Sequence, residues 1–110
     1  MRRDYLTDFE LMVLLSVLRG GDDAYGVRIA QEIETRGERA VMLATVYTAL
    51  DRLEANGHVS STMGQPTPER GGRAKKYFRV TTAGLRAVRR AQRAFTRLWM
   101  GIPQLEGNRP

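Results

Sequence analysis

One run of the chain, residues 45–81, constrains the fold more than any other part of the sequence. It opens with an amphipathic segment, Thr45–Gly57, that is typical of a helix ended by glycine. It closes with a basic segment, Gly72–Thr81, in which apolar and polar residues alternate as in a half-buried strand. We therefore predict a helix followed by a β-hairpin whose second strand carries positive charge.

Two helices are predicted ahead of this run. The first begins after Thr7, which forms a capping box with Glu10, and apolar residues on nearly every face place this helix at the centre of the fold. The second extends from Tyr25 to about Arg36, and its apolar stripe consists of Val27, Ile29, Ala30 and Ile33. We expect Gly26, in the first turn, to allow close approach of another backbone.

The third helix has two distinct faces. Its apolar residues, at positions i, i+4 and i+7, are Val46, Leu50 and Leu53. Another face carries short hydroxyls and one guanidinium, groups that can reach base edges or phosphates: Thr45, Thr48 and Arg52. An ordinary solvent-exposed face is the alternative interpretation of these residues. A short strand over 41–43 is expected to lead into the helix.

Two strands are predicted to form the hairpin, His58–Thr62 and Ala74–Thr81. In the second strand, Phe78 and Val80 are expected to face the core, because neighbouring residues on a strand point to opposite faces. The connection over 63–72 contains several Gly and Pro residues and is longer than a tight turn. We expect this loop to be either disordered or functional.

The last helix is predicted to follow Thr81 and Thr82, either of which could cap it, and to reach about Met100. Alternating steps of three and four residues, the a/d spacing of a coiled coil, connect Leu85, Val88, Gln92, Phe95, Trp99 and Ile102. Because Phe95 and Trp99 would form an unfavourable apolar patch on a monomer, we predict a homodimer through this helix. The alternative is a helix that packs only on its own domain.

These elements predict a mostly α fold with a small β-hairpin, a winged helix-turn-helix with an added C-terminal helix. With 110 residues, the chain is long enough for one core and too short for two. We assign residues 1–81 to a winged-helix DNA-binding domain, 82–103 to a dimerisation helix and 104–110 to a flexible tail.

Charge is polarised along the sequence. Residues 1–69 contain seven Lys and Arg against eleven Asp and Glu, whereas residues 70–110 contain eleven against one. A polyanion is the natural partner for the basic part, and nucleic acid is the commonest polyanion, although a solvated surface would explain the same charge. An RNA-binding or protein-interaction module also stays open. Readers of single-stranded RNA, however, usually have more aromatic residues among the basic ones than Tyr77 and Phe78.

Composition argues against several other classes of protein. The sequence has no cysteine, which excludes disulfides and thiolate metal sites, and it has a single histidine, His58, and no carboxylates clustered at catalytic or metal-binding spacing. We therefore expect no enzyme, no metal and no cofactor. The longest apolar run is far shorter than a membrane span, and the N-terminus has no signal-peptide pattern. These features favour a cytoplasmic protein without a membrane partner.

Several of these features, in this order, resemble the PadR family of winged-helix transcriptional regulators, specifically its short members with one C-terminal helix. The resemblance rests on Tyr25-Gly26, on Thr45-Val-Tyr47 with Arg52-Leu53-Glu54, and on Lys76–Thr81 followed by Gly84. It implies a homodimer that binds a pseudo-palindromic operator in double-stranded DNA, usually to repress transcription. The DNA-contacting residues implied by the resemblance are Tyr25, Thr45, Tyr47, Thr48, Arg52, Arg73, Lys75 and Lys76.

One departure from the family pattern precedes the third helix, where Met42 and Leu43 replace a small polar residue. Some family members bind aromatic drugs or phenolic acids near the dimer interface. By this resemblance, Phe95 and Trp99 would form a stacking platform for a small aromatic effector. The simpler interpretation is that both rings belong only to the core of the interface.

Overall fold

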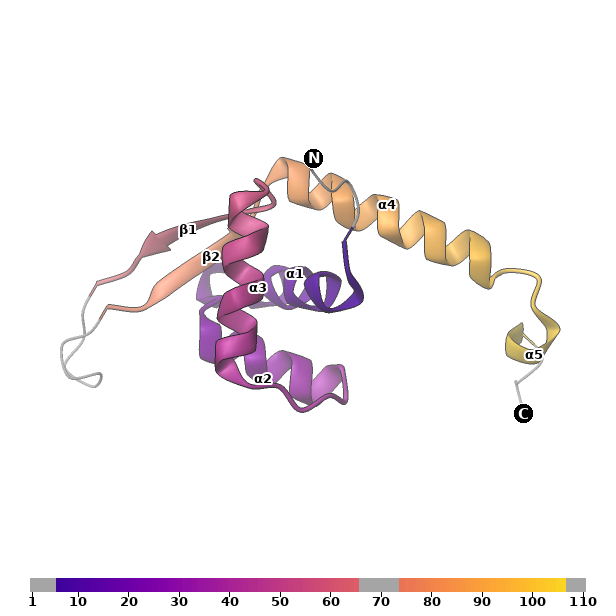
Figure 1. Ribbon diagram of the computed structural model, residues 1–110, viewed down its shortest axis with the longest axis horizontal. Coiled ribbons are helices and arrows are strands. Elements are labelled where there is room, and N and C mark those ends of the chain that lie inside the picture. Colours follow the sequence, from indigo (N-terminus) through magenta and orange to yellow (C-terminus); the bar gives the residue numbers. More distant parts are fainter. Residues whose placement is uncertain (1–5, 66–73, 107–110) are drawn as a thin grey trace.

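Helices predominate in the computed structural model, which describes residues 6–65 and 74–106. The helices are α1 (Asp8–Gly20), α2 (Gly26–Arg36), α3 (Leu43–Ala55), α4 (Thr82–Trp99) and α5 (Pro103–Glu106). A 3-10 helix, η1 (Gly21–Asp23), connects α1 to α2, and strands β1 (Val59–Met63) and β2 (Lys76–Val80) form an antiparallel hairpin. The predicted fold class, mostly helical with a small hairpin, is confirmed (Figure 1).

Helix α1 begins at the predicted capping box. The Glu10 N–H donates to Thr7 Oγ1 at 3.1 Å, and the Thr7 N–H donates to Glu10 Oε1 at 2.9 Å. The helix contacts α2, α3, α4 and β2, which confirms its central position. Because these elements pack around it, its apolar residues can occupy most of its circumference.

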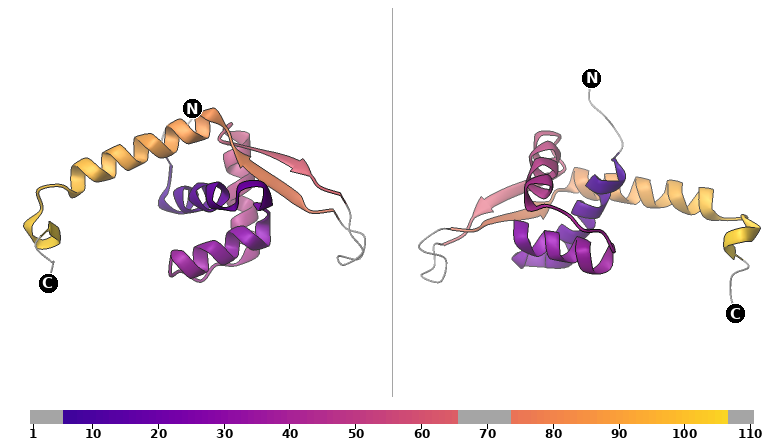
Figure 2. Two further views of the ribbon diagram at one scale, coloured as in Figure 1. Left: turned by 180° about the vertical axis from the view of Figure 1, so that it is seen from behind. Right: turned by 60° about the horizontal axis from the view of Figure 1, so that its bottom comes forward.

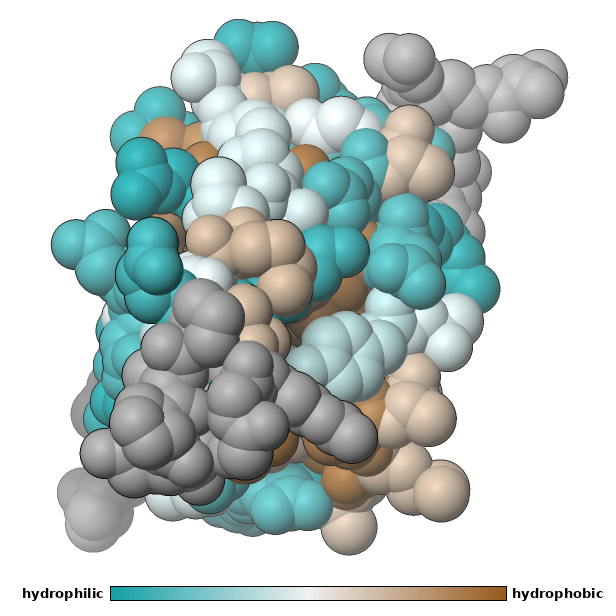
Figure 3. All heavy atoms as spheres, turned by 90° about the vertical axis from the view of Figure 1, so that its left-hand side faces the viewer, coloured by the Kyte–Doolittle hydropathy of each residue, from teal (hydrophilic) through white to brown (hydrophobic). Residues whose placement is uncertain are grey.

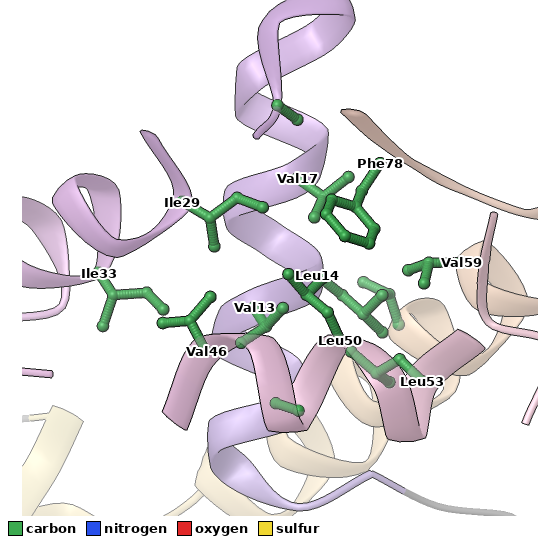
Figure 4. Close-up of a cluster of buried hydrophobic side chains, with 13 residues drawn as sticks. Val13, Leu14, Val17, Ile29, Ile33, Val46, Leu50, Leu53, Val59 and Phe78 are labelled. Atoms are coloured by element: carbon green, nitrogen blue, oxygen red, sulfur yellow. The ribbon is translucent and has the colours of Figure 1, made fainter. Parts of the chain in front are cut away.

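One core connects the helices and the hairpin (Figure 4). Its buried residues are Val13, Leu14, Val17, Ala24, Ile29, Ile33, Val46, Ala49, Leu50, Leu53, Val59, Phe78 and Val88. The inward orientation predicted for the apolar face of α3 and for Phe78 is therefore confirmed. The apolar stripe predicted for α2 is wrong at Val27, which lies exposed at the edge of the stripe.

The hairpin is attached to the start of α2. Strand register pairs Val59 with Val80 and Met63 with Lys76, so β1 begins one residue later than predicted and β2 is shorter at both ends. An isolated bridge pairs Tyr25 with Tyr77, and the Phe78 N–H donates to the Ala24 carbonyl at 2.8 Å. The hairpin and the N-terminus of α2 therefore hold each other in place.

The strand predicted over 41–43 is wrong. The Met42 carbonyl accepts hydrogen bonds from the N–H groups of Thr45 and Val46, so Met42 caps α3 and Leu43 is its first residue. The β-forming preference of this segment has no neighbouring strand to pair with, because the bridge to the hairpin is made by Tyr25. Of the predicted loop over 63–72, residues 66–72 lie outside the described part of the chain.

Helix α4 packs on the rest of the chain through its first turns and extends away from it beyond them. Of the two predicted caps, Thr81 is the one used: its Oγ1 accepts from the Gly84 N–H at 3.0 Å and donates to the Gly57 carbonyl at 2.6 Å. The first turns pack on the body through Ala87 and Val88, and the remainder extends away from the side that carries the hairpin (Figures 1 and 2). Residues 104–106, predicted as part of a flexible tail, belong to α5.

Candidate nucleic-acid interface

A hollow of about 320 Å³ lies where the starts of α2 and α3 meet the beginning of β2. Its lining residues are Tyr25, Val27, Leu43, Tyr47, Ala74, Lys75 and Lys76. We call it the tyrosine–lysine hollow, because two tyrosines and two lysines provide its polar groups and none of its lining residues is acidic. Four of the residues predicted to contact DNA are thus brought together from three parts of the chain.

Aromatic rings position the two ammonium groups of this hollow. Lys75 Nζ lies 4.0 Å from the centroid of the Tyr25 ring, and Lys76 Nζ lies 5.6 Å from that of Phe78. The Tyr25 and Tyr77 rings in turn form a T-shaped pair, with 5.8 Å between their centroids. A ring face attracts an ammonium group without neutralising its charge as a carboxylate would. The two lysines therefore keep their attraction for an anion.

Tyr47 enters the hollow because position 26 has no side chain. A Cβ atom built on Gly26 would overlap the Tyr47 hydroxyl and the carbon that bears it. The prediction that Gly26 allows another backbone to approach is wrong, since the group that approaches is a side chain of α3. This contact joins the first turns of α2 and α3 and directs the phenol toward the hollow.

The exposed face of α3 carries Thr45 and Thr48, as the sequence indicated. Thr48 Oγ1 donates to the Ala44 carbonyl at 3.0 Å, which leaves the oxygen as an acceptor. Asp51, three residues beyond Thr48, is exposed on the same face and was missed by the sequence analysis. Helical spacing from Thr48 would have indicated it. A carboxylate here can accept a hydrogen bond from a base amino group in a major groove.

Arg52 occupies a different place from the other predicted residues. It is not part of the tyrosine–lysine hollow; its Nη1 lies 3.8 Å from Oε2 of Glu10 in α1. Only 1% of Glu10 is exposed, whereas about half of the Arg52 side chain is. Arg52 thus lies between α1 and solvent, and its predicted contact with DNA stays a prediction. Arg73 lies outside the described residues.

The second half of α4, residues 91–99, exposes the largest apolar side chains of the predicted interface. We call it the outer half, and residues 82–90 the inner half. Phe95 is 50% exposed and Trp99 is 60% exposed. They line a second hollow, of about 420 Å³, together with Gln92, Thr96, Met100 and Glu106. The sequence analysis missed two exposed apolar side chains, Leu98 in the same half of the helix and Met100 directly after its end.

The residues of the predicted dimer interface in the first half of α4 are less exposed. Val88 belongs to the core of its own chain, so little of its side chain is left for a second subunit. Leu85 and Ile102 are partly buried, and Gln92 is exposed. The alternative, in which the helix packs only on its own domain, therefore holds for the first turns of α4. It does not account for the exposed apolar residues of the later turns. The roles of these residues in a dimer stay predictions.

Within residues 6–65 and 74–106, no helix is long and apolar enough to cross a membrane. In the same part of the chain, no three His, Cys, Asp or Glu side chains gather where they could hold a metal ion.

Known proteins resemble this chain in sequence and in fold. Residues 14–90 match the model of the transcriptional regulator PadR-like family. A transcriptional regulator from Clostridium thermocellum is 26% identical in sequence, with a TM-score of 0.66 and 82% of each chain covered. A PadR family transcriptional regulator from Eggerthella lenta is 25% identical, with a TM-score of 0.68 and coverage of 92% of this chain and 85% of that one. A Streptococcus transcriptional regulator is 27% identical, with a TM-score of 0.65 and coverage of 82% and 83%. No curated protein matches the sequence.

Proposed function

This chain belongs to the PadR-like family of transcriptional regulators, and we propose that it represses transcription as a homodimer on a pseudo-palindromic DNA operator. Its winged-helix fold is that of a DNA-binding regulator, and members of its family are transcriptional regulators, not enzymes. The observation that carries the finer proposal is the tyrosine–lysine hollow beside the start of α3.

The hollow suits a phosphate of the DNA backbone. Tyrosine hydroxyls and lysine ammonium groups both donate hydrogen bonds, and the ammonium charges attract the phosphate anion. Figure 3 shows the molecule from the side of the hairpin, where hydrophilic residues cover much of the surface. A phosphate held between Tyr25, Tyr47 and Lys75 would place the start of α3 against the adjacent major groove. Thr45 and Thr48 would then face base edges.

The outer half of α4 supports the dimeric part of the proposal. At least half of the Phe95 and Trp99 side chains is exposed, and a second subunit packed on this apolar surface would bury them. Two copies related by a twofold axis would present two α3 helices to successive major grooves, about 34 Å apart, which is the spacing of a palindromic operator.

An aromatic effector is a second part of the proposal. The 420 Å³ hollow at Phe95 and Trp99 is lined mainly by apolar groups and lies on the surface proposed for dimerisation. A flat aromatic molecule stacked there would contact both rings. Titrating planar cations and phenolic acids while following Trp99 fluorescence tests this part. A saturable change is expected, and no change with any candidate would remove the support for an effector.

Selection from a random pool of DNA duplexes tests DNA binding and symmetry together. We expect the protein to enrich an inverted repeat, because a twofold dimer reads two equivalent half-sites. The double variant Lys75→Gln/Lys76→Gln should then bind every duplex more weakly. For this variant, the slope of the logarithm of the binding constant against the logarithm of the salt concentration should be smaller in magnitude by about 1 for each lysine that contacts a phosphate.

Arg36→Gln is the matched control, since it removes a charge from the surface of α2 where Arg36 is paired with Glu32. It should leave both DNA affinity and its salt dependence unchanged. Enrichment of single, unrepeated sites would contradict the dimer. Tighter binding to single-stranded RNA than to duplex DNA would favour the RNA-binding alternative instead.

A further inference from the structure

Five arginines and no acidic residue lie on α4. They are Arg86, Arg89, Arg90, Arg93 and Arg97, and all are exposed. Three of them, Arg86, Arg93 and Arg97, project within about 40° of one another around the helix axis, since each residue turns a helix by about 100°. We call these three residues the arginine face.

Within the described part of the chain, no residue of the arginine face forms an ion pair. Elsewhere in that part arginines do find carboxylates: Arg28 pairs with Asp23 and Arg36 with Glu32. The charge of the arginine face is therefore not neutralised by a carboxylate of residues 6–65 or 74–106, and it remains available to an anion from outside.

The arginine face points away from the rest of the winged-helix body. Helix α4 packs on the body through Gly84, Ala87 and Val88, and helical geometry places the arginines about 150° around the axis from them. The tyrosine–lysine hollow lies at the start of α3, beside α2, whereas the end of α3 adjoins the first turn of α4 (Figure 1). A duplex seated in the hollow would thus have the body between it and the arginine face.

We propose that the arginine face of α4 binds the phosphate backbone of a second DNA duplex, so that a dimer on its operator can hold another DNA segment. This inference rests on the proposed function, because the tyrosine–lysine hollow must hold the first duplex. Guanidinium groups are always charged and bind phosphates through two parallel hydrogen bonds. Arg86 and Arg97 are separated by about 16 Å along the helix, a length over which one DNA strand presents about five phosphates.

An anionic membrane surface is the rival partner for an amphipathic helix of this kind. Such helices bury their apolar face in the lipid. The apolar face of α4 is covered by its own core in the inner half, and by the second subunit in the outer half under the proposed function. DNA requires only the arginines, so DNA fits the geometry better.

A capture experiment with the full chain tests this second site. An operator duplex selected as above is fixed to beads and saturated with protein, and binding at this step is measured first. A fluorescent duplex without the operator is then added, and the amount retained is measured over a range of salt concentrations. We expect wild-type protein to retain the second duplex, with retention falling steeply as salt rises.

The test variant is Arg86→Gln/Arg93→Gln/Arg97→Gln, which preserves helix-forming residues. It should bind the bead-bound operator like wild type and retain at least about tenfold less of the second duplex. The control, Arg19→Gln/Arg36→Gln/Arg39→Gln, removes the same charge from other surfaces and should retain as much as wild type.

Three results would overturn the second site. In the first, operator-bound wild-type protein retains no second duplex. In the second, the test variant retains as much second duplex as wild type. In the third, wild-type protein sediments with phosphatidylserine-containing vesicles and does not retain the second duplex. Failure to bind the bead-bound operator in the first step would instead overturn the proposed function, and with it this inference.

Discussion

Gly26 decides where the Tyr47 ring can lie, although it contributes no side chain of its own. A methyl group at position 26 would overlap the phenol. We predict that Gly26→Ala displaces Tyr47 from the hollow, lowers the free energy of unfolding by about 1–3 kcal/mol and weakens DNA binding. Urea unfolding and fluorescence anisotropy measure the two effects.

Tyr47→Ala provides the matched control for this prediction, because it removes the ring that the methyl group displaces. In the double variant the clash is absent, so its loss of DNA affinity should be no larger than that of Tyr47→Ala alone. Fully additive losses would show that Gly26 and Tyr47 act independently.

Arg52 and Glu10 form the second residue-scale contact with consequences for DNA binding. Glu10 is buried and caps α1, so its partner across the helix interface affects stability as well as the DNA surface. We predict that the stability losses of Arg52→Ala and Glu10→Gln are not additive, with a coupling of about 0.5–1 kcal/mol in a double-mutant cycle. Urea unfolding of the four proteins measures it.

DNA binding gives an independent check on Arg52. Because the guanidinium lies beside α1, Arg52→Ala should weaken binding to all duplexes similarly. An absence of coupling to Glu10, together with a loss that changes with operator sequence, would show that Arg52 reads bases instead.

At the scale of elements, the junction between the hairpin and α4 depends on Thr81. Its hydroxyl caps the helix and also donates to the Gly57 carbonyl, whereas the neighbouring Thr82 is exposed in the first turn. We predict that Thr81→Ala lowers the free energy of unfolding by about 1 kcal/mol or more. Thr82→Ala should change it by less than about 0.5 kcal/mol, as surface substitutions usually do. Equal effects in thermal or urea unfolding would contradict this assignment of the cap.

Local patterns predicted the elements well where the cause was local. The capping box at Thr7 and the apolar spacing of Val46, Leu50 and Leu53 depend on residues within one helix, and both are confirmed. The strand over 41–43 failed because a strand requires a neighbour, and nothing in that segment shows that its neighbour is absent.

Contacts between elements were harder to predict. The approach of Tyr47 to Gly26 joins two helices, so glycine alone indicated a close contact without identifying the approaching group. The polar face of α3 was visible as a pattern, but the pattern does not show that Arg52 turns toward α1 while Tyr47 turns toward the hairpin. The lysines of the hairpin were predicted from charge, and the aromatic rings that position them follow only from the fold.

At the scale of the whole molecule, two surfaces besides the arginine face of α4 suit partners of different chemistry. The tyrosine–lysine hollow is basic and lies on the side of the hairpin, whereas the outer half of α4 is apolar on the face that carries Phe95 and Trp99. Since these surfaces are separate, dimerisation and contact with DNA can be disrupted independently. A variant that changes only the apolar surface should retain the fold and the phosphate contacts of each winged helix.

We therefore predict that Phe95→Ala/Trp99→Ala converts the proposed dimer to a monomer with an unchanged far-ultraviolet circular dichroism spectrum, because neither ring belongs to the core. Light scattering measures the mass. Operator affinity should fall by about a hundredfold or more, since the second half-site is then no longer bound by a linked domain. Arg93→Gln, which lies on the opposite face of α4, is the control and should stay dimeric. If the double variant remained a dimer with full operator affinity, the subunits would have to associate through another surface, and the hollow at Phe95 and Trp99 would be left open to an effector alone.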